Sequence, residues 1–267
     1  MSIEHLRKMQ STGAVDLIST LRTVEINITD ICNRECSFCP QSLDDYSYKS
    51  SIKLDIIEKI AFDLSAIDYN GRVSFVGFGE PLLYKNLHKA VDIINRIVKN
   101  VKWIEINTNA DYLTRDKAEV LALSGCTNLT VSMYDYDISS KITSLLAGIE
   151  IELTFKHCYA ILPVVNRNDI ISQETVLNIN RQCFLPFYKM LIDSTGDVLI
   201  CNNDWGRNGV IGSIKEQSIQ EIWFSEKISN YRNELKNGNR NKCDPCKYCN
   251  INGKQYGKDS YDIWINA

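Results

Sequence analysis

Apolar and polar residues alternate along this chain with two different periods. Val24, Ile26 and Ile28 alternate with polar neighbours, which is the period-2 pattern of a β-strand. Residues 52–67 instead space their apolar side chains three and four positions apart, as an amphipathic helix does. The same two patterns predict further strands at 72–78, 101–106, 129–133 and 149–155, and further helices at 87–98, 114–123 and 138–146. Thr114 is placed to cap the helix that begins there.

This alternation of strands and helices predicts a parallel sheet joined by right-handed crossovers. Such a sheet either stays open or curls into a barrel, and in both forms the functional loops lie at the carboxyl ends of the strands. Three chemically rich segments follow the first three predicted strands, at residues 32–39, 77–81 and 107–109. We therefore expect these segments to meet on one rim of the sheet.

The pattern changes after residue 168. Residues 187–193 and 197–200 predict a β-hairpin with Gly196 in its turn. A helix is predicted at 218–235, and the Lys-Asn-Gly sequence that follows it is a C-cap signal. The last thirty residues are rich in Asn, Lys and Gly, so they hold too little apolar material to fold without a staple.

Composition narrows the class of protein. The 267 residues are 44% apolar and 24% charged, which is ordinary for a globular protein. A net charge of −3 argues against nucleic-acid binding, which normally needs a basic surface. No apolar run approaches the roughly 18 residues of a membrane helix, and the N-terminus lacks the apolar segment of a signal peptide. A cytoplasmic enzyme or binding protein is therefore expected.

Ten cysteines are unusual for such a protein, because the cytosol does not favour disulfides. Seven of them form two groups in polar, turn-rich segments: Cys32, Cys36 and Cys39, and then Cys183, Cys201, Cys246 and Cys249. The remaining three are Cys126, Cys158 and Cys243. Cysteines that serve as small hydrophobic residues would follow the apolar periods instead. The grouping indicates metal ligation.

The first group supplies three thiolates from one short loop. Structural zinc takes four ligands, and catalytic zinc sites with three protein ligands normally use His or carboxylate. A 4Fe–4S cluster takes four cysteines. Three thiolates would therefore leave one iron open to an added ligand, as inner-sphere electron transfer to a bound molecule requires.

The spacing C-x3-C-x-aromatic-C, with Phe38 as the aromatic residue, resembles the radical S-adenosylmethionine superfamily. This resemblance implies that the open iron chelates the methionine moiety of S-adenosylmethionine and that cleavage releases a 5′-deoxyadenosyl radical. Residues 77–81 resemble the Gly-Gly-Glu-Pro loop of that superfamily, although Phe78 replaces one glycine, and residues 107–110 resemble a Thr-Asn-Gly loop that here ends in Ala110. The cofactor-binding residues implied by the resemblance are Phe38, Gly79, Glu80, Thr108, Asn109 and Ser132.

The four cysteines of the second group suit either zinc or a second 4Fe–4S cluster. Their arrangement around a hairpin and a helix resembles twitch, a short form of the SPASM auxiliary-cluster domain, and this resemblance implies a second cluster. Spacing alone leaves open whether Cys243 replaces Cys246. The expected fold is α/β, with a partial (β/α)6 barrel at 23–168, a twitch domain at 169–267 and a helical extension at 1–22.

Longer stretches resemble the 2-deoxy-scyllo-inosamine dehydrogenases of the same superfamily. They include 31–36, 71–75, 79–83, 85–87, 166–167 and 246–250. The resemblance implies oxidation of a sugar or cyclitol hydroxyl, with Arg167 contacting substrate and the second cluster accepting an electron. Phe78 and Asn107 stand where those enzymes have tyrosines, and residues 202–204 replace an aromatic–acid pair, so a different substrate is expected.

Other functions stay open. A radical epimerase would need a thiol that returns a hydrogen atom, and Cys158 is the residue selected for this catalytic role, with Cys126 and Cys243 as other possibilities. Peptide modification is a second route, although a precursor-binding domain is not evident. A zinc-stapled binding protein is the non-enzymatic alternative. A radical enzyme would also need a flavodoxin- or ferredoxin-type electron donor as its partner.

Overall fold

The computed structural model describes residues 16–158, 166–167, 170 and 181–266, and within them eight strands form one sheet. The strands are β1 (Thr23–Ile26), β2 (Arg72–Phe75), β3 (Trp103–Thr108), β4 (Asn128–Met133), β5 (Glu152–His157), β6 (Lys189–Ile192), β7 (Asp197–Leu199) and β8 (Val210–Ser213). Their order is β5-β4-β3-β2-β1-β6-β7-β8. The pairs from β5 through β6 are parallel, and β7 and β8 continue the sheet in antiparallel pairs. The α/β class is thus confirmed, and six strands are parallel, the sixth being β6, which the sequence assigned only to a hairpin. The sheet is not a closed barrel, because β5 and β8 are its two edges in the described part of the chain.

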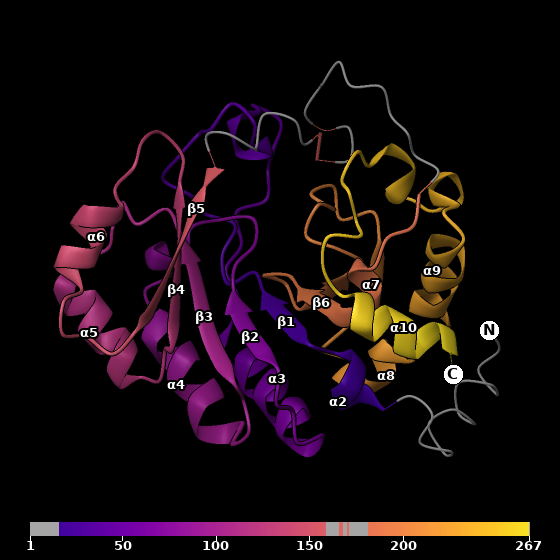
Figure 1. Cartoon of the computed structure of the whole chain (residues 1–267), viewed down its shortest axis with the longest axis horizontal. Helices are drawn as coiled ribbons and strands as arrows, with labels where there is room; N and C mark the ends of the chain where they lie inside the picture. The colour runs from indigo at the N-terminus through magenta and orange to yellow at the C-terminus, as the bar shows by residue number, and fades with distance from the viewer. Residues whose placement is uncertain (1–15, 159–165, 168–169, 171–180, 267) are drawn as a thin grey trace.

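Helices cover the outer face of the sheet and its C-terminal end. They are α2 (Leu17–Thr20), α3 (Leu54–Ala66), α4 (Leu87–Ile97), α5 (Arg115–Leu123), α6 (Ser139–Leu145), α7 (Leu185–Tyr188), α8 (Ile219–Trp223), α9 (Glu226–Lys236) and α10 (Lys258–Asn266). Short 3-10 turns are η1 (Pro40–Ser42), η2 (Pro81–Leu83), η5 (Arg240–Lys242) and η6 (Cys246–Tyr248). In Figure 1, α5 and α6 lie at one end of the sheet, and α9 and α10 gather beside β6 at the other.

The period-2 pattern gives the parallel strands two different faces. Val24 and Ile26 of β1 and Ile104 and Ile106 of β3 are buried in the main apolar core. Successive side chains of a strand point to opposite faces, so the residues between them form a polar inner face. Glu25, Ser74, Glu105 and Thr130 are buried members of this polar set. The polar face supplies the interior of the partial barrel with groups for chemistry.

Most expected elements are present, with bounds shifted by a few residues. Thr114 caps α5 by accepting a hydrogen bond from the Lys117 backbone N–H, as predicted. The single helix predicted at 218–235 is wrong, because the chain breaks between α8 and α9, where the Ser225 side chain caps the second helix. Of the expected helical extension at 1–22, only residues from 16 onward lie within the described part of the chain.

The predicted hairpin is present, but its first strand has a second partner. β6 and β7 pair in antiparallel fashion around Gly196. On its other side β6 pairs in parallel with β1, in the register Thr23↔Lys189. The sheet is therefore continuous from the predicted barrel into the C-terminal segment, and the two cysteine groups are attached to one rigid framework.

Candidate functional site

The loop that carries the first three cysteines leaves the sheet at the carboxyl end of β1. The Cys39 backbone N–H donates to the Cys36 carbonyl at 2.8 Å, which closes a turn. The Gln41 side-chain amide then donates to the carbonyls of Asp30 at 2.6 Å and Phe78 at 2.8 Å. Gln41 is buried, so these two bonds fasten the cysteine loop to the loop after β2.

The predicted site residues surround one cavity of about 240 Å³ at the carboxyl ends of the parallel strands. Its lining contains all three cysteines and each of the other residues singled out around them: Cys32, Cys36, Phe38, Cys39, Gly79, Glu80, Thr108, Asn109, Ser132, Cys158 and Arg167. These residues come from the loops after β1, β2 and β3, from the ends of β3 and β4, and from the segment after β5. The expectation that the three chemically rich segments meet on one rim is confirmed by this cavity.

Glu80 joins the loop after β2 to the loop after β3. Its carboxylate accepts hydrogen bonds from the Thr108 hydroxyl at 2.6 Å, the Asn109 backbone N–H at 2.8 Å and the Leu82 backbone N–H at 2.9 Å. Burial raises the pKa of Glu80, and these donors oppose that rise. A carboxylate offers about four lone-pair sites, so one acceptor position remains for a ligand.

Gly79 lies where the loop after β2 passes the strand exit that leads to Cys32. A Cβ atom at this position would lie 2.4 Å from the Thr29 carbonyl oxygen and 2.6 Å from that of Ile31. The Glu80 backbone N–H also donates to the Ile31 carbonyl at 2.9 Å. Glycine is therefore required here by the close approach of two backbones, a reason that the motif alone did not supply.

Asn109 links the loop after β3 to the cysteine loop. Its side-chain amide donates to the Asn33 side chain at 2.9 Å. Arg34 adds a bidentate ion pair with Asp111 and a further contact to Asp135, each at 2.6 Å. This bidentate geometry is the strong form of the arginine–carboxylate pair. The cysteine loop is thus held from both sides before any cofactor is considered.

Phe38, the aromatic residue of the cysteine motif, stacks on Tyr134 with ring centroids 5.7 Å apart. Tyr134 follows β4 and also lines the cavity. Ser132 at the end of β4 is hydrogen-bonded to Tyr134 and to Cys158. Burial raises the pKa of Cys158, so this cavity-lining thiol stays protonated near neutral pH.

Arg167, in the segment after β5, lines the cavity. Its backbone φ of 48° is in the left-handed region, which is uncommon for a residue with a side chain. One guanidinium N–H donates to the Asn203 side chain at 3.2 Å, and the guanidinium lies 5.8 Å from the Trp205 ring centre. Its Nε is buried and has no hydrogen-bond partner among the described residues.

Sequence reasoning singled out Asn202, which lines the cavity, but missed Tyr134, Lys156 and Trp205. Lys156 could have been identified from the sequence, because the alternation along β5 places its side chain on the same face as that of Cys158. Trp205 could not have been identified from the sequence, because its position depends on a loop that returns to the cavity after Cys201. It packs against Phe78 with ring centroids 4.7 Å apart.

The first three thiols suit a metal cluster. Burial raises the pKa of Cys39 to about 11, and it also raises the pKa of Cys32 and Cys36. Such thiols need a positive partner to become thiolates, and a bound metal supplies one. Three sulfurs on the wall of a cavity that continues past them leave space for a further ligand.

The second cysteine group surrounds a separate, apolar cavity. Its walls are the four expected cysteines together with Leu185, Pro186, Ile200, Leu235, Arg240 and Ile251. Gly253 passes so close that a Cβ atom there would lie 2.3 Å from the Cys183 sulfur. Burial raises the pKa of Cys201 and Cys246 above the usual value, and the charges of the neighbouring cysteines raise it further.

The four thiols line one shared space. Within the described residues, no three His, Cys, Asp or Glu side chains are close enough together to hold one metal ion. In a 4Fe–4S cluster each cysteine binds a different iron, so the sulfurs surround the cluster instead of converging on a point. The four-thiol cavity fits that donor set.

Cys243 and Cys126 lie outside both cavity linings. Cys243 packs with Leu235 and Cys246 in a small apolar cluster. Cys126 is buried in the main core, and its thiol donates to the Asn128 carbonyl at 3.4 Å. Both positions favour a packing role. None of the described helices has the length and apolar content needed to cross a membrane.

Family models match two parts of the chain. The model of the radical SAM superfamily matches residues 26–141, and the model of SPASM, an iron–sulfur cluster-binding domain, matches residues 183–250. The first match contains the loop with Cys32, Cys36 and Cys39. The second contains all four cysteines of the apolar cavity.

Known proteins resemble the chain over most of its length. It is 30% identical over 243 residues to S-adenosyl-L-methionine-dependent 2-deoxy-scyllo-inosamine dehydrogenase of Niallia circulans, with 90% of this chain and 96% of that enzyme covered. GTP 3′,8-cyclase of Aquifex aeolicus is 29% identical over 116 residues, which is 43% of this chain and 35% of that protein.

Two solved structures share the fold. BtrN in complex with AdoMet and 2-DOIA superposes with a TM-score of 0.77 at 29% identity, covering 89% of this chain and 97% of that one. Native anSMEcpe with bound AdoMet superposes with a TM-score of 0.59 at 14% identity, over 91% of this chain and 97% of that one, and shows the fold alone.

Proposed function

Because this chain belongs to the radical S-adenosylmethionine superfamily and matches the SPASM iron–sulfur domain, we propose that it oxidises a hydroxyl group of a small sugar- or cyclitol-like substrate. The observation that carries the proposal is the single cavity lined by the three motif cysteines, the loops after β2 and β3, and Arg167. The 2-deoxy-scyllo-inosamine dehydrogenase supports the reaction type, since it is similar over nearly the whole of both chains.

We assign the ligands of the two 4Fe–4S clusters as follows: Cys32, Cys36 and Cys39 for the radical cluster, and Cys183, Cys201, Cys246 and Cys249 for the auxiliary cluster. The raised pKa of the buried thiols supports this assignment, because a metal must stabilise them as thiolates. The position of Cys243 outside the four-thiol cavity favours Cys246 as the ligand.

Cys32, Cys36 and Cys39 would hold a cluster that supplies the one-electron reduction needed to cleave S-adenosylmethionine and so to oxidise a substrate carbinol. Cys183, Cys201, Cys246 and Cys249 would hold a cluster that supplies an acceptor for the electron released by that oxidation. The residues of this chain position the reactants. Phe38, Gly79, Glu80, Thr108, Asn109 and Ser132 form the cofactor-binding wall. Arg167, which lines the cavity, would bind substrate oxygens, for which a planar fork of N–H groups is suited.

The division of the chain follows from this assignment. Residues 23–168 hold the radical site, residues 169–267 hold the auxiliary site, and the continuous sheet joins them. A flavodoxin- or ferredoxin-type protein is the proposed electron donor. A reducing compartment, the cytoplasm, is proposed because both thiol groups need to stay free of disulfides, and all ten cysteines are free thiols in the structure.

Epimerisation is a second candidate, and one observation favours it. The Cys158 thiol lines the cavity and stays protonated, so it can return a hydrogen atom to a substrate radical. Replacing Cys158 with Ala separates the two reactions. Dehydrogenation would continue in this variant, whereas epimerisation would stop while S-adenosylmethionine cleavage persists.

The proposal is tested with the chain reconstituted anaerobically. The reduced protein should contain about eight irons and convert S-adenosylmethionine to 5′-deoxyadenosine and methionine. Replacing Cys32, Cys36 and Cys39 with Ala should abolish this conversion, while Cys126→Ala, a buried cysteine outside both cavities, should retain it. Cleavage that survives the triple replacement would refute the assignment.

A further inference from the structure

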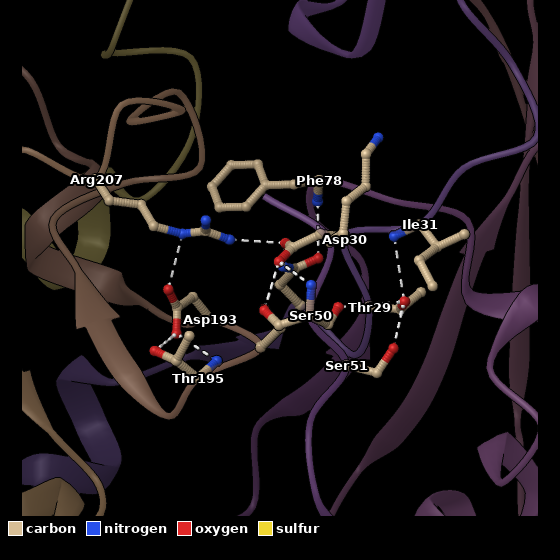
Figure 2. A network of polar contacts seen from close by, with 12 residues as sticks. Thr29, Asp30, Ile31, Ser50, Ser51, Phe78, Asp193, Thr195 and Arg207 are labelled. Carbon is tan, nitrogen blue, oxygen red and sulfur yellow. Dashed lines mark hydrogen bonds and ion pairs between the residues drawn. The ribbon is translucent and has the colours of Figure 1, made fainter. Parts of the chain in front are cut away.

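Arg207 connects the segment after the second cysteine group to the base of the first cysteine loop. Its Nη2 donates to Asp30 Oδ1 at 2.7 Å, and its Nε forms an ion pair with Asp193 Oδ2 at 2.9 Å. The Arg207 side chain is 9% exposed, and both carboxylates are fully buried. Figure 2 shows the guanidinium between the two carboxylates, with Phe78 alongside. One buried cation therefore bridges two elements that lie far apart in the sequence.

Asp30 links Arg207 to the radical site. It precedes Cys32 by two residues, and it also accepts hydrogen bonds from the side chains of Ser50 and Ser194, each at 2.7 Å. The Asn27 side chain donates to the same Asp30 oxygen that Arg207 contacts, at 2.7 Å, and its own oxygen accepts the Phe78 backbone N–H at 2.8 Å. The network thus reaches the base of the cysteine loop and the loop after β2.

Arg207 itself belongs to the segment that begins with the cluster ligand Cys201. Asp204 in this segment accepts the backbone N–H groups of Asn208 at 3.0 Å and Gly209 at 2.7 Å, which fixes the loop internally. Trp205, two residues before Arg207, lines the radical cavity. Arg207 has a left-handed φ of 52°, a strained conformation that persists when surrounding contacts hold it.

The chemistry of the bridge requires arginine. A planar fork reaches two carboxylates at once, whereas a lysine ammonium is a single point of charge. The guanidinium carbon also lies 3.7 Å from the Tyr48 ring centre and 5.4 Å from that of Phe78, so aromatic faces cover it. Removing one partner of such a buried pair is costly, because the other charge is left uncompensated.

We propose that Arg207 is a positioning residue that fixes the segment after Cys201 against the Cys32 loop, and so sets the relative placement of the auxiliary and radical sites. This inference rests on the proposed function. The inference goes beyond the proposed function, because it assigns the relative placement of the two sites to one side chain that ligates neither cluster and lines neither cavity. Arg207 acts through Asp30, Asp193 and its own backbone.

The test measures the distance between the two reduced clusters by pulsed electron paramagnetic resonance in the full chain. Arg207→Gln should broaden or shift the inter-cluster distance distribution, and Arg207→Lys should restore it in part. Asp193→Asn, which removes the ion pair between Arg207 and Asp193 but keeps the one between Arg207 and Asp30, should give an intermediate change in the distance distribution. Iron content and the spectral response of the radical cluster to S-adenosylmethionine are measured on each sample.

Lys189→Gln is the matched control. It removes another buried ion pair, Lys189–Glu25 at 3.0 Å, which joins β6 to β1 and involves neither Arg207 nor its two carboxylate partners. Its distance distribution should match that of the unaltered chain. The proposal is overturned if the distance distributions of Arg207→Gln and Asp193→Asn both superpose on that of the unaltered chain. It is also overturned if Lys189→Gln shifts the distribution as much as Arg207→Gln does. If Arg207→Gln fails to fold, Asp193→Asn decides alone. If the chain does not cleave S-adenosylmethionine but the distance distributions change as expected, the proposed function is rejected and the role of Arg207 stands.

A second inference comes from the charges that line the radical cavity. Three cations line it, Arg34, Lys156 and Arg167, against one carboxylate, Glu80. Arg34 is neutralised by Asp111 and Asp135, and Glu80 is held by three donors. Among the described residues, Lys156 donates a hydrogen bond to the Asn107 side-chain oxygen at 3.1 Å, and Arg167 donates one to the Asn203 side-chain oxygen at 3.2 Å. Two positive charges therefore face the substrate space with neutral partners.

We infer that the substrate of the proposed reaction carries an anionic group, a phosphate or a carboxylate, that Arg167 and Lys156 bind. An ammonium group beside these two side chains would meet two like charges, and Glu80, the one carboxylate in the described lining, already accepts three hydrogen bonds. Charge-assisted hydrogen bonds from arginine and lysine are about twice as strong as neutral ones, so the preference for an anion should be pronounced.

Four probes separate the possibilities in binding measurements on the holoenzyme with S-adenosylmethionine. They are myo-inositol 1-phosphate, glucuronate, neutral myo-inositol and the cationic 2-deoxy-scyllo-inosamine. At least one anionic probe should bind about tenfold or more tightly than myo-inositol, a difference that corresponds to about 1.4 kcal/mol. The two anionic probes tell a phosphate site from a carboxylate site.

Lys156→Glu should remove this preference, and Lys89→Glu should keep it. Lys89 is exposed on α4, away from the cavity lining, and its replacement changes the net charge by the same amount. The inference falls if neither anionic probe binds more tightly than myo-inositol, or if the aminocyclitol binds most tightly. Such a result leaves the proposed function standing, because S-adenosylmethionine cleavage without substrate is measured separately.

Discussion

Glu105 shows how a single residue of the polar inner face is kept charged. It is buried on β3, where it accepts the Thr130 hydroxyl at 2.6 Å and the Ser74 hydroxyl at 2.8 Å, and Arg72 lies 3.4 Å away. Burial raises the pKa of Glu105, but the Thr130 bond, the Arg72 charge and the Ser74 bond outweigh burial and lower it overall. The carboxylate is therefore part of the framework below the cavity.

Thr130→Val removes the shortest of these bonds and should lower the free energy of unfolding by about 1.5–3 kcal/mol near pH 7. A depressed folded pKa stabilises the fold above the unfolded pKa, and this contribution is lost as pH falls through the folded pKa. The variant raises the folded pKa, so its deficit should shrink as the pH is lowered to about 4. Anaerobic urea unfolding at several pH values checks both points.

Thr154→Val is the control for this prediction. Thr154 is the register partner of Thr130 on β5, and it is exposed. Its replacement should change the free energy of unfolding by less than about 0.5 kcal/mol. If both variants lose the same free energy of unfolding, the loss comes from replacing a threonine hydroxyl in a strand and not from the hydrogen bond to Glu105.

Individual site residues were predictable from the sequence where local spacing determines their chemistry. The three cysteines of the first loop, Glu80 and Asn109 belong to short motifs at strand ends, and topology brings such ends together. Arg207 could not be predicted, because its two partners lie more than 170 residues upstream and 14 residues upstream, and only the folded chain places them together. Buried ion pairs of this kind leave no periodic signal.

At the scale of elements, the short helix α8 depends on its N-terminus. Ser218 accepts the Glu221 backbone N–H at 3.2 Å, and the Glu221 carboxylate accepts the Ser218 backbone N–H at 2.7 Å and its hydroxyl at 2.8 Å. This is a capping box, in which two otherwise unpaired N–H groups are satisfied reciprocally. The helix buries Ile219, Ile222 and Trp223 against the core.

Ser218→Ala should lower the free energy of unfolding by about 1 kcal/mol, because the N-terminus of α8 loses its cap. Ser140→Ala, at an exposed position inside α6, is the same chemical change without a cap to lose. Thermal or urea unfolding of the two variants should therefore differ. Equal stability would indicate that packing of α8 alone fixes its start.

Element types were predictable along most of the chain, and element partners were less so. The apolar periods identified each parallel strand and its helix within a few residues. The break between α8 and α9 was missed because the apolar spacing continues across it, while the Ser225 side chain starts a new helix. The parallel pairing of β6 with β1 was also missed, since it joins residues that are about 165 positions apart and follows no local pattern.

At the scale of the whole molecule, the sheet determines how the two cysteine sites relate. The Cys32 loop leaves β1, and Cys201 follows β7, which is separated from β1 by β6 alone. The C-terminal segment then returns to close the four-thiol cavity with Cys246 and Cys249. We therefore expect the proposed auxiliary cluster to stabilise this segment, which is poor in apolar residues, in addition to its redox role.

The two neighbouring cysteines of the tail provide the sharpest test of this double role. Cys246 lines the four-thiol cavity, whereas Cys243 packs beside it in an apolar cluster. Cys246→Ala should reduce the iron content from about eight to about four per chain and stop net substrate oxidation, while S-adenosylmethionine cleavage continues. Amide hydrogen exchange in residues 236–257 should rise in this variant, since the loop loses its covalent anchor.

Cys243→Ala should retain about eight irons and ordinary exchange protection, apart from a modest loss of stability from the vacated apolar volume. The reverse outcome, with iron lost in Cys243→Ala and kept in Cys246→Ala, would exchange the ligand assignment. Loss of iron in Cys246→Ala without faster exchange in the tail would separate the two roles. The tail would then be held by its packing on α9 and by the Arg240 contacts to the carbonyls of Arg181 and Ile251, and the cluster would serve electron transfer alone.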